Sequence, residues 1–208
     1  MTQTPDRKAL RQQMRQQRRR LSKHEQAVAA TLLARQIQSH PLFLRSKSIA
    51  IYLANDGEID PAQIVKLAWK QRKHCFLPVL HPIRHNRLWF FAYTQKTRLR
   101  QNIFDIAEPA LRNTVRRPPW SISLIFMPLV AFDKQGGRLG MGGGFYDRTF
   151  AFAKDGSRTV RLCGLAHDFQ CTAALPIESW DIPLDGIFTE KHFYPASNAL
   201  KKRVSENG

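Results

Sequence analysis

The apolar segment LIFMPLVAF, residues 124–132, constrains the fold of this chain more than any other stretch of its sequence. Such a run of bulky apolar residues is typical of a strand that is buried in a protein core. A glycine-rich segment follows it, and a helix is expected from about 146 to 153. The order of strand, glycine-rich turn and helix is typical of α/β proteins, in which ligands bind beyond the carboxyl ends of the strands.

Other apolar runs alternate with helix-like stretches along the chain. We expect strands at 47–54, 75–80, 87–93, 161–167 and 184–190, helices over 7–38 and from 61 to about 72, and an irregular segment at 94–120. Ser22 and Glu25 have the spacing of a capping box, which predicts a break in the first helix near residue 22. This alternation predicts an α/β fold with α/β/α layers, a mostly parallel central sheet and a basic N-terminal helix. A length of 208 residues fits a single domain, 1–208.

The charge of the chain limits the kinds of partner it can attract. With 33 Lys and Arg against 16 Asp and Glu, its formal net charge is +17. Such a field attracts polyanions: nucleic acid, anionic membranes, nucleotide phosphates and polyglutamate chains. No apolar run reaches the length of a membrane span, so we expect no membrane association.

The cysteines and the N-terminus bear on the compartment. The three cysteines are few, odd in number and form no CxxC pair, which favours a reducing, cytoplasmic location. The N-terminus lacks the apolar stretch of a signal peptide. Its Arg-rich composition would also suit a mitochondrial presequence, which is the less favoured alternative because a functional basic helix explains it equally well.

The glycine-rich segment, GGRLGMGGGFYDR at 136–148, indicates an anion site. Glycines let backbone amides approach a ligand closely, and amides turned inward form a nest for phosphate. The segment has no Lys, so it is not a Walker loop, and Phe145 occupies a position where the dinucleotide fingerprint needs glycine. The alternative is a flexible surface turn, which rarely needs so many glycines beside two aromatic residues and an acid.

This segment resembles the signature of the 5-formyltetrahydrofolate cyclo-ligase family, approximately G-x-R-L-G-x-G-x-G-Y-Y-D. The resemblance extends to RKALR (7–11), IYLANDGEID (51–60), FMPLVAFD (126–133), GLAHDFQ (164–170) and DIPLDGIFTE (181–190). Two positions depart from the family pattern. Phe145 replaces a usual Tyr, which removes a hydroxyl but keeps a stacking face, and Trp180 replaces a frequent His, which puts an acid–base role there in doubt.

The resemblance implies ATP-dependent closure of 5-formyltetrahydrofolate to 5,10-methenyltetrahydrofolate, with release of ADP and phosphate. In that scheme ATP phosphorylates the formyl oxygen and N10 then attacks. No protein nucleophile is required, because catalysis rests on positioning and charge stabilisation. The implied ligands are ATP and the folate, including its polyglutamylated forms, and no specific nucleic acid.

The resemblance also implies site residues. For ATP these are Arg7, Lys8, Arg11, Arg138, Leu139, Gly140, Met141, Gly142, Gly143, Gly144, Phe145 and Tyr146. For the folate they are Leu53, Glu58, Met141, Gly142, Gly143, Gly144 and Phe145. Magnesium is the implied metal, with Asp147 and Asp185 as its ligands, since Mg²⁺ commonly takes one or two carboxylates together with phosphate oxygens.

Each of these assignments has a plainer alternative. The basic residues of the first helix would form a solvated face, and the acids would belong to a helix terminus, a turn or a loop. Phe145 and Tyr146 would pack in the core.

Because Gly143 is variable in the family pattern, we expect Gly143→Ala to be tolerated better than the same change at Gly142 or Gly144.

Two other functions compete with the ligase. A nucleic-acid-binding basic protein without catalysis would explain the charge and the stretch RQQMRQQRRR, but not the glycine-rich segment. An interaction module would bind a nucleotide without performing chemistry on it.

Overall fold

The structure, a computed structural model, describes residues 6–110, 114–155 and 160–196. Its centre is an eight-stranded sheet with the order β13-β12-β10-β7-β1-β2-β3-β6. These strands are β1 (Ser48–Ala50), β2 (His74–Leu80), β3 (Leu88–Tyr93), β6 (Arg116–Arg117), β7 (Leu124–Pro128), β10 (Arg161–Leu165), β12 (Gly186–Phe188) and β13 (Phe193–Pro195). The five strands from β12 to β2 run parallel. At the edges, β13 pairs antiparallel with β12, β3 pairs antiparallel with β2, and β6 pairs antiparallel with β3. The predicted α/β class and mostly parallel sheet are therefore confirmed.

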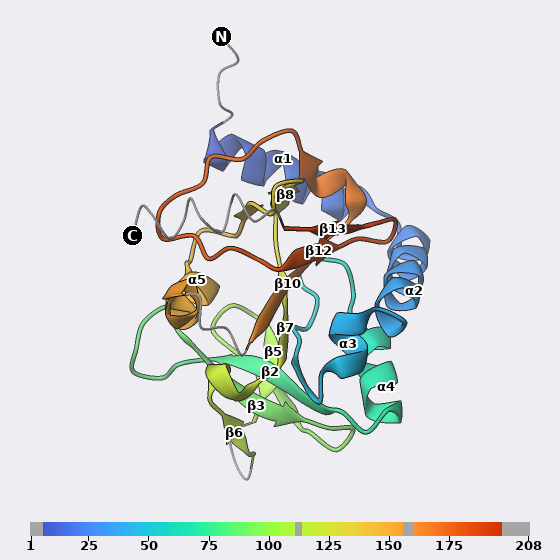
Figure 1. The fold of residues 1–208 in the computed structure, drawn as a ribbon, viewed down its shortest axis with the longest axis vertical. Coiled ribbons are helices and arrows are strands. Elements are labelled where there is room, and N and C mark those ends of the chain that lie inside the picture. The colour runs from blue at the N-terminus through green and yellow to red at the C-terminus, as the bar shows by residue number, and fades with distance from the viewer. Residues whose placement is uncertain (1–5, 111–113, 156–159, 197–208) are drawn as a thin grey trace.

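Helices cover both faces of the sheet (Figure 1). They are α1 (Arg7–Arg20), α2 (Lys23–Gln38), α3 (Pro41–Arg45), α4 (Ala62–Lys70) and α5 (Phe145–Thr149), with short 3₁₀ turns at Pro119–Ser121, Ala151–Asp155 and Asp168–Gln170. Figure 1 shows α2, α3 and α4 on one side of the sheet, α5 on the other and α1 across one end. Among the described residues, no helix has both the length and the apolarity needed to cross a membrane.

Strand side chains alternate between two cores. In β7, Leu124 and Phe126 pack beneath α2, α3 and α4, whereas Ile125 and Met127 pack against the α5 side. Because successive residues of a strand point to opposite faces, an uninterrupted apolar run is what a sheet covered on both faces requires. The apolar segment of the sequence thus places β7 at the centre of the sheet.

The predicted strand 124–132 is in fact two strands. After β7 the chain turns, and β8 (Ala131–Asp133) joins β9 (Arg138–Leu139) and β11 (Cys171–Thr172) in a small separate sheet. The turn is stabilised by the Gln170 amide, whose Nε2 donates to the carbonyls of Leu129 at 2.9 Å and Val130 at 2.7 Å. A distant side chain therefore satisfies backbone groups that a longer strand would have paired in the main sheet.

Other element boundaries also differ from the sequence-based expectation. The first helix does break at Ser22, where the predicted capping box with Glu25 forms. The strand expected at 47–54 is confined to β1, and the helix expected at 146–153 is α5 followed by a 3₁₀ turn. The segment expected to be irregular contains β4 (Leu99–Gln101), β5 (Ala107–Pro109) and β6.

The connections of the sheet determine where a ligand can bind. The strands β1 and β7 are neighbours in the sheet. From β1 the chain leads to β2, which lies beside β1 on the side away from β7, and from β7 it leads to β10, which lies beside β7 on the side away from β1. Where the connections of two adjacent parallel strands diverge, their carboxyl ends leave a crevice that is the usual ligand site of such sheets. This topology predicts a site between the segments that follow β1 and β7.

Candidate active site

A cavity of about 1190 Å³ lies at that position. Tyr52, Leu53 and Glu58 from the loop after β1 line it, together with Pro128 and Leu129 at the end of β7. It is also lined by the glycine-rich segment, by arginines of α1, by residues of β2 and β3, and by residues from the segments 102–107 and 178–181. Segments far apart in the sequence therefore converge where the topology predicts a ligand site.

Most of the residues predicted for ligand binding line this cavity. They are Arg7, Arg11, Leu53, Glu58, Arg138, Gly140, Met141, Gly142, Gly143, Gly144, Phe145, Tyr146 and Asp147. The structure thus brings most of the predicted ATP and folate residues into one cavity, whose volume exceeds that of the usual site for a drug-sized ligand.

Three predicted residues do not line the cavity. Lys8 is exposed on the outer side of α1, and Leu139 is buried in a small core with Leu10 and Met14. Asp185 precedes β12, and its carboxylate accepts hydrogen bonds from the Leu162 N–H at 2.8 Å and from Arg161 at 3.1 Å.

The position of Asp185 corrects the expectation of a joint metal site with Asp147. Asp185 and Leu162 stand at the amino ends of the parallel strands β12 and β10, whereas the cavity opens beyond the carboxyl ends of β1 and β7. Within the described ranges, no group of three or more His, Cys, Asp or Glu residues could hold a metal.

The glycine-rich segment is shaped by two kinds of constraint. Asp133 holds the turn between β8 and β9 by accepting from the Gly137 N–H at 2.9 Å. Further along, Gly142 has φ +100° and Gly144 has φ +64°, in the region that favours glycine. Gly144 is also the residue from which α5 begins. Glycine is therefore needed at these two positions for backbone conformation, independently of any ligand.

Arg138 and Asp147 form a pair on the cavity wall. Nη2 of Arg138 donates to Oδ1 of Asp147, and the Ile182 N–H donates to the same oxygen at 3.1 Å. Only 5% of the Arg138 side chain is exposed, and its buried Nε atom has no partner in the described structure. A buried guanidinium with an unused donor is costly, and an anionic ligand in the cavity would compensate for that cost.

Two arginines of α1 reach the cavity from the opposite side. Arg11 donates from Nε to the Gly140 carbonyl at 2.8 Å, which joins the helix to the glycine-rich segment. Arg7 forms an ion pair with Asp181 at 3.4 Å and donates to the Pro176 carbonyl at 3.3 Å. The predicted basic helix is therefore a wall of the site, and its inner arginines do not form a merely solvated face.

The loop after β1 contributes a buried carboxylate. Glu58 accepts from the Asn55 N–H at 3.1 Å, and burial raises the pKa of its carboxyl to about 7 despite the opposing charge of Arg18. Tyr52 lies beside it, and burial raises the pKa of its phenol, which donates to the Ile59 carbonyl at 2.8 Å. A carboxylate with a pKa near neutrality inside a cavity is typical of a functional site.

The aromatic residues of the segment serve both the cavity and the core. Tyr146 lines the cavity and stacks on Phe150, with ring centroids 6.4 Å apart and planes at 12°. Phe145 meets Phe104 edge to face. Trp180 also lines the cavity and is 62% exposed. The core-packing alternative is thus partly right for both Phe145 and Tyr146, which pack against the core on the α5 side of the sheet.

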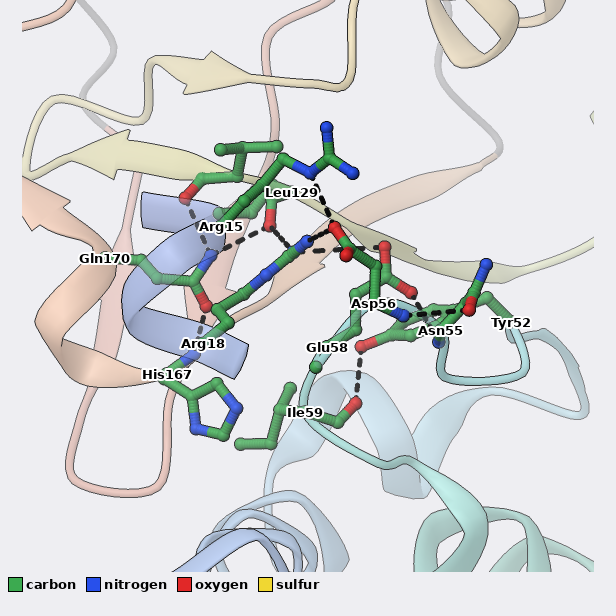
Figure 2. A network of polar contacts seen from close by, with 12 residues as sticks. Arg15, Arg18, Tyr52, Asn55, Asp56, Glu58, Ile59, Leu129, His167 and Gln170 are labelled. Atoms are coloured by element: carbon green, nitrogen blue, oxygen red, sulfur yellow. Dashed lines mark hydrogen bonds and ion pairs between the residues drawn. The ribbon is translucent and has the colours of Figure 1, made fainter. Parts of the chain in front are cut away.

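Several lining residues were missed by sequence reasoning. Arg15, Arg19 and Asp56 also line the cavity, and both arginines bind the Asp56 carboxylate. Figure 2 shows the contact between Arg15 and Asp56. The arginines repeat at intervals of four residues from Arg7 to Arg19, which on a helix places them on one side. That spacing was the available signal, but the partner acid could not be found from it.

Comparisons with known proteins agree with this geometry. The model of the 5-formyltetrahydrofolate cyclo-ligase family matches residues 3–190. The chain is 40% identical to 5-formyltetrahydrofolate cyclo-ligase of Haemophilus influenzae, over 84% of this chain and 94% of that protein. It is 37% identical to the Escherichia coli K12 protein of the same name, over 85% and 96%.

A solved structure shares the fold. The NMR structure of Aquifex aeolicus 5,10-methenyltetrahydrofolate synthetase superimposes with a TM-score of 0.78 at 30% identity, covering 92% of this chain and 93% of that one. The fold and the site define an α/β enzyme of the ATP-dependent ligase class. The chain belongs to the 5-formyltetrahydrofolate cyclo-ligase family, whose reaction converts 5-formyltetrahydrofolate to 5,10-methenyltetrahydrofolate.

Proposed function

We propose that the cavity holds ATP and 5-formyltetrahydrofolate side by side and directs the γ-phosphoryl group of ATP onto the formyl oxygen. The observation that carries this proposal is the convergence of the glycine-rich segment, the α1 arginines and Glu58 on one cavity. Family membership gives the overall reaction, and the arrangement of charges suggests how each substrate is oriented.

The phosphate chain of ATP fits the end of the cavity where Arg11, Arg138 and the glycine-rich segment meet. Guanidinium groups form bidentate hydrogen bonds with phosphate oxygens. At Gly140 and Gly142 an added Cβ would meet no atom nearer than 3.7 Å, which leaves room for close approach of the backbone. Because Arg11 already contacts the Gly140 carbonyl, ATP would bind to a preformed corner between α1 and this segment.

The folate fits the end formed by the loop after β1. The amino-pyrimidine edge of the pterin carries two adjacent N–H donors, and the ionised carboxylate of Glu58 can accept from both. Leu53 and Phe145, which also line the cavity, offer apolar surface for the flat ring. The pterin would then present its formyl group toward the glycine-rich segment.

The reaction balances without a protein nucleophile. The formyl oxygen attacks the γ-phosphorus, the bond to the bridging oxygen breaks, and ADP leaves. N10 then attacks the activated formyl carbon and loses its proton, and expulsion of inorganic phosphate leaves the methenyl bridge. The protein contributes alignment and positive charge, which are the main catalytic factors in phosphoryl transfer.

Magnesium fits this site through one carboxylate. Both described contacts of Asp147 engage Oδ1, so its Oδ2 would be available to hold the cation, which commonly takes one or two carboxylates together with phosphate. When bound, the ion would offset the charge of the polyphosphate. Asp147 would hold it, and Arg138 would fix the orientation of the Asp147 carboxylate.

The function is tested by mixing the protein with 5-formyltetrahydrofolate, ATP and magnesium and recording the absorbance of methenyltetrahydrofolate. We expect product in proportion to ADP. Product without ADP, or ADP without product, would contradict the proposal. Tight binding of duplex DNA at physiological salt, with no turnover, would favour the nucleic-acid alternative.

Arg11→Ala is expected to raise the KM for ATP by about tenfold and to leave the KM for the folate nearly unchanged, because loss of one charge-assisted contact costs about 1.5–3 kcal/mol. Steady-state kinetics with each substrate varied in turn measures both constants. Lys8→Ala is the matched control, since Lys8 lies on the same helix but outside the cavity. Equal increases in the two KM values would indicate that Arg11 has a structural role and does not contact ATP.

The surplus positive charge is proposed to speed capture of anionic folate polyglutamates. Among the described residues, six arginines line the cavity: Arg7, Arg11, Arg15, Arg19, Arg138 and Arg148. A cytoplasmic location is proposed on the cysteine pattern alone.

A further inference from the structure

Arg18 is a buried arginine that lies behind the cavity wall. It is 1% exposed, and Figure 2 shows its guanidinium directed from α1 toward the loop after β1. Nη2 donates to Asp56 Oδ2 at 2.9 Å, and Nη1 donates to the Leu129 carbonyl at 3.3 Å. Nη1 also lies 4.0 Å from Glu58 Oε1. Arg18 therefore links α1 to the segments that follow both β1 and β7, although it does not line the cavity itself.

The turn that carries Glu58 is packed directly on Arg18. Asp56 has φ +51° and Gly57 has φ +74°, so two successive residues are left-handed. A Cβ atom on Gly57 would lie 2.9 Å from the backbone carbon and oxygen of Arg18, so only glycine allows this approach. On the far side, the Gln26 amide donates to the Gly57 carbonyl at 3.1 Å. The position of Glu58 is thus determined by the contact between this turn and α1.

The charges around Glu58 act in opposite directions. Burial raises the pKa of Glu58 to about 7, the positive charge of Arg18 lowers it and the negative charge of Asp56 raises it. Tyr52 from the end of β1 and Tyr146 from α5 also face Glu58, and burial raises the pKa of both phenols, so they stay neutral near pH 7. Besides burial, which has the largest effect, the ionisation of Glu58 near neutral pH depends on the charge of Arg18, on the hydrogen bond from the Asn55 N–H and on the charge of Asp56.

Only the ionised form of Glu58 suits the folate edge. A carboxylate accepts two hydrogen bonds from adjacent donors, whereas a protonated carboxyl would set its own O–H against one of them. Folate capture should therefore increase as the pH rises through the pKa of Glu58.

We propose that Arg18, from behind the cavity wall, and Asp56, which lines the cavity, are positioning residues that set the place and the charge of Glu58 and hence the pH range of folate capture. This inference rests on the proposed contact between Glu58 and the folate. Neither residue needs to touch the reacting atoms, so both act through Glu58.

The test is the pH profile of kcat/KM for 5-formyltetrahydrofolate at saturating ATP, from about pH 5.5 to 9, since this constant reports groups of the enzyme before folate binds. The wild-type profile should rise with an inflection near 7. Arg18→Met removes the positive charge and should move the inflection upward by about one pH unit, with about a fivefold loss at pH 7 and recovery at high pH.

Asp56→Asn should move the inflection the other way. It removes a negative charge beside Glu58 and leaves Arg18 in place, and Asn tolerates the left-handed backbone at this position. Opposite shifts in the two variants cannot result from a general loss of stability. Arg20→Met, an exposed charge removed from the same helix, is the control and should leave the inflection unchanged.

Glu58→Gln separates this inference from the proposed function. It should abolish the inflection, because a carboxamide does not titrate. If it does so while Arg18→Met and Asp56→Asn leave the inflection at its wild-type position, the role of Arg18 and Asp56 is refuted and the folate contact stands. An inflection that persists in Glu58→Gln overturns the folate contact and this inference with it. If Arg18→Met does not fold, the inference is judged from Asp56→Asn alone. A shift of its inflection to lower pH supports the inference, and an unchanged or higher inflection contradicts it.

Discussion

Asp147→Asn is expected to lower kcat by about 100-fold or more, because charges that are aligned on a transferring phosphoryl group are commonly worth that much. The variant keeps the shape of the side chain but loses the charge that orients Arg138 and that would bind magnesium. The magnesium concentration at half-maximal rate should rise as well. Steady-state rates over a magnesium series measure both effects, at a temperature well below the melting transition of the variant.

Asp185→Asn is the matched comparison. This carboxylate binds the Leu162 N–H and Arg161 at the amino ends of the strands, so the change should cost stability, by about 1–3 kcal/mol, rather than rate. A loss of turnover as large as that of Asp147→Asn, with the same magnesium dependence, would restore the joint metal site. Unchanged turnover in Asp147→Asn would remove Asp147 from the reaction.

Alanine substitutions in the glycine-rich segment should reduce activity in a defined order. Gly142→Ala and Gly144→Ala force a Cβ onto left-handed backbone, with φ +100° and +64°, at a cost on the order of 1 kcal/mol each. Displacement of the phosphate chain by about 1 Å would lower the rate by roughly 100-fold. Gly140→Ala should be the mildest change, since its Cβ would meet only Arg138 Nη1, at 3.8 Å.

The same geometry keeps the order expected for Gly143 but adds a cost at that position. Its Cβ would lie 2.6 Å from a ring carbon of Phe145, so Gly143→Ala requires the ring to move although the backbone is not left-handed. Its effect should fall between those of Gly140→Ala and Gly142→Ala. Melting temperature and kcat/KM for ATP, measured together, separate backbone strain from loss of the phosphate site. Full activity in all four variants would mean that the segment does not hold phosphate.

Local signals in the sequence predicted much of the fold. The capping box at Ser22, the buried strand that became β7 and the alternation of strands and helices depend on neighbouring residues alone. The end of β7 could not be predicted, because it depends on the Gln170 amide, which binds the carbonyls of Leu129 and Val130 from about forty positions away.

Sequence reasoning could predict those residues of the site whose type by itself indicates a kind of ligand. Glycines and arginines near a strand end indicate a phosphate site. The Arg18–Asp56 pair was missed, because an arginine in a basic run shows no sign of burial until α1 is placed against the loop after β1. Asp185 was assigned by resemblance, which conveys a role without showing which end of the sheet the residue occupies.

The central claim is that the cavity aligns ATP for transfer of its γ-phosphoryl group to the formyl oxygen. The most direct test follows an ¹⁸O label from the formyl group of 5-formyltetrahydrofolate during turnover with unlabelled ATP in unlabelled water. If the formyl oxygen is phosphorylated and then expelled, the label should appear in inorganic phosphate, one atom for each methenyltetrahydrofolate formed. Label released to water, with unlabelled phosphate, would contradict the account.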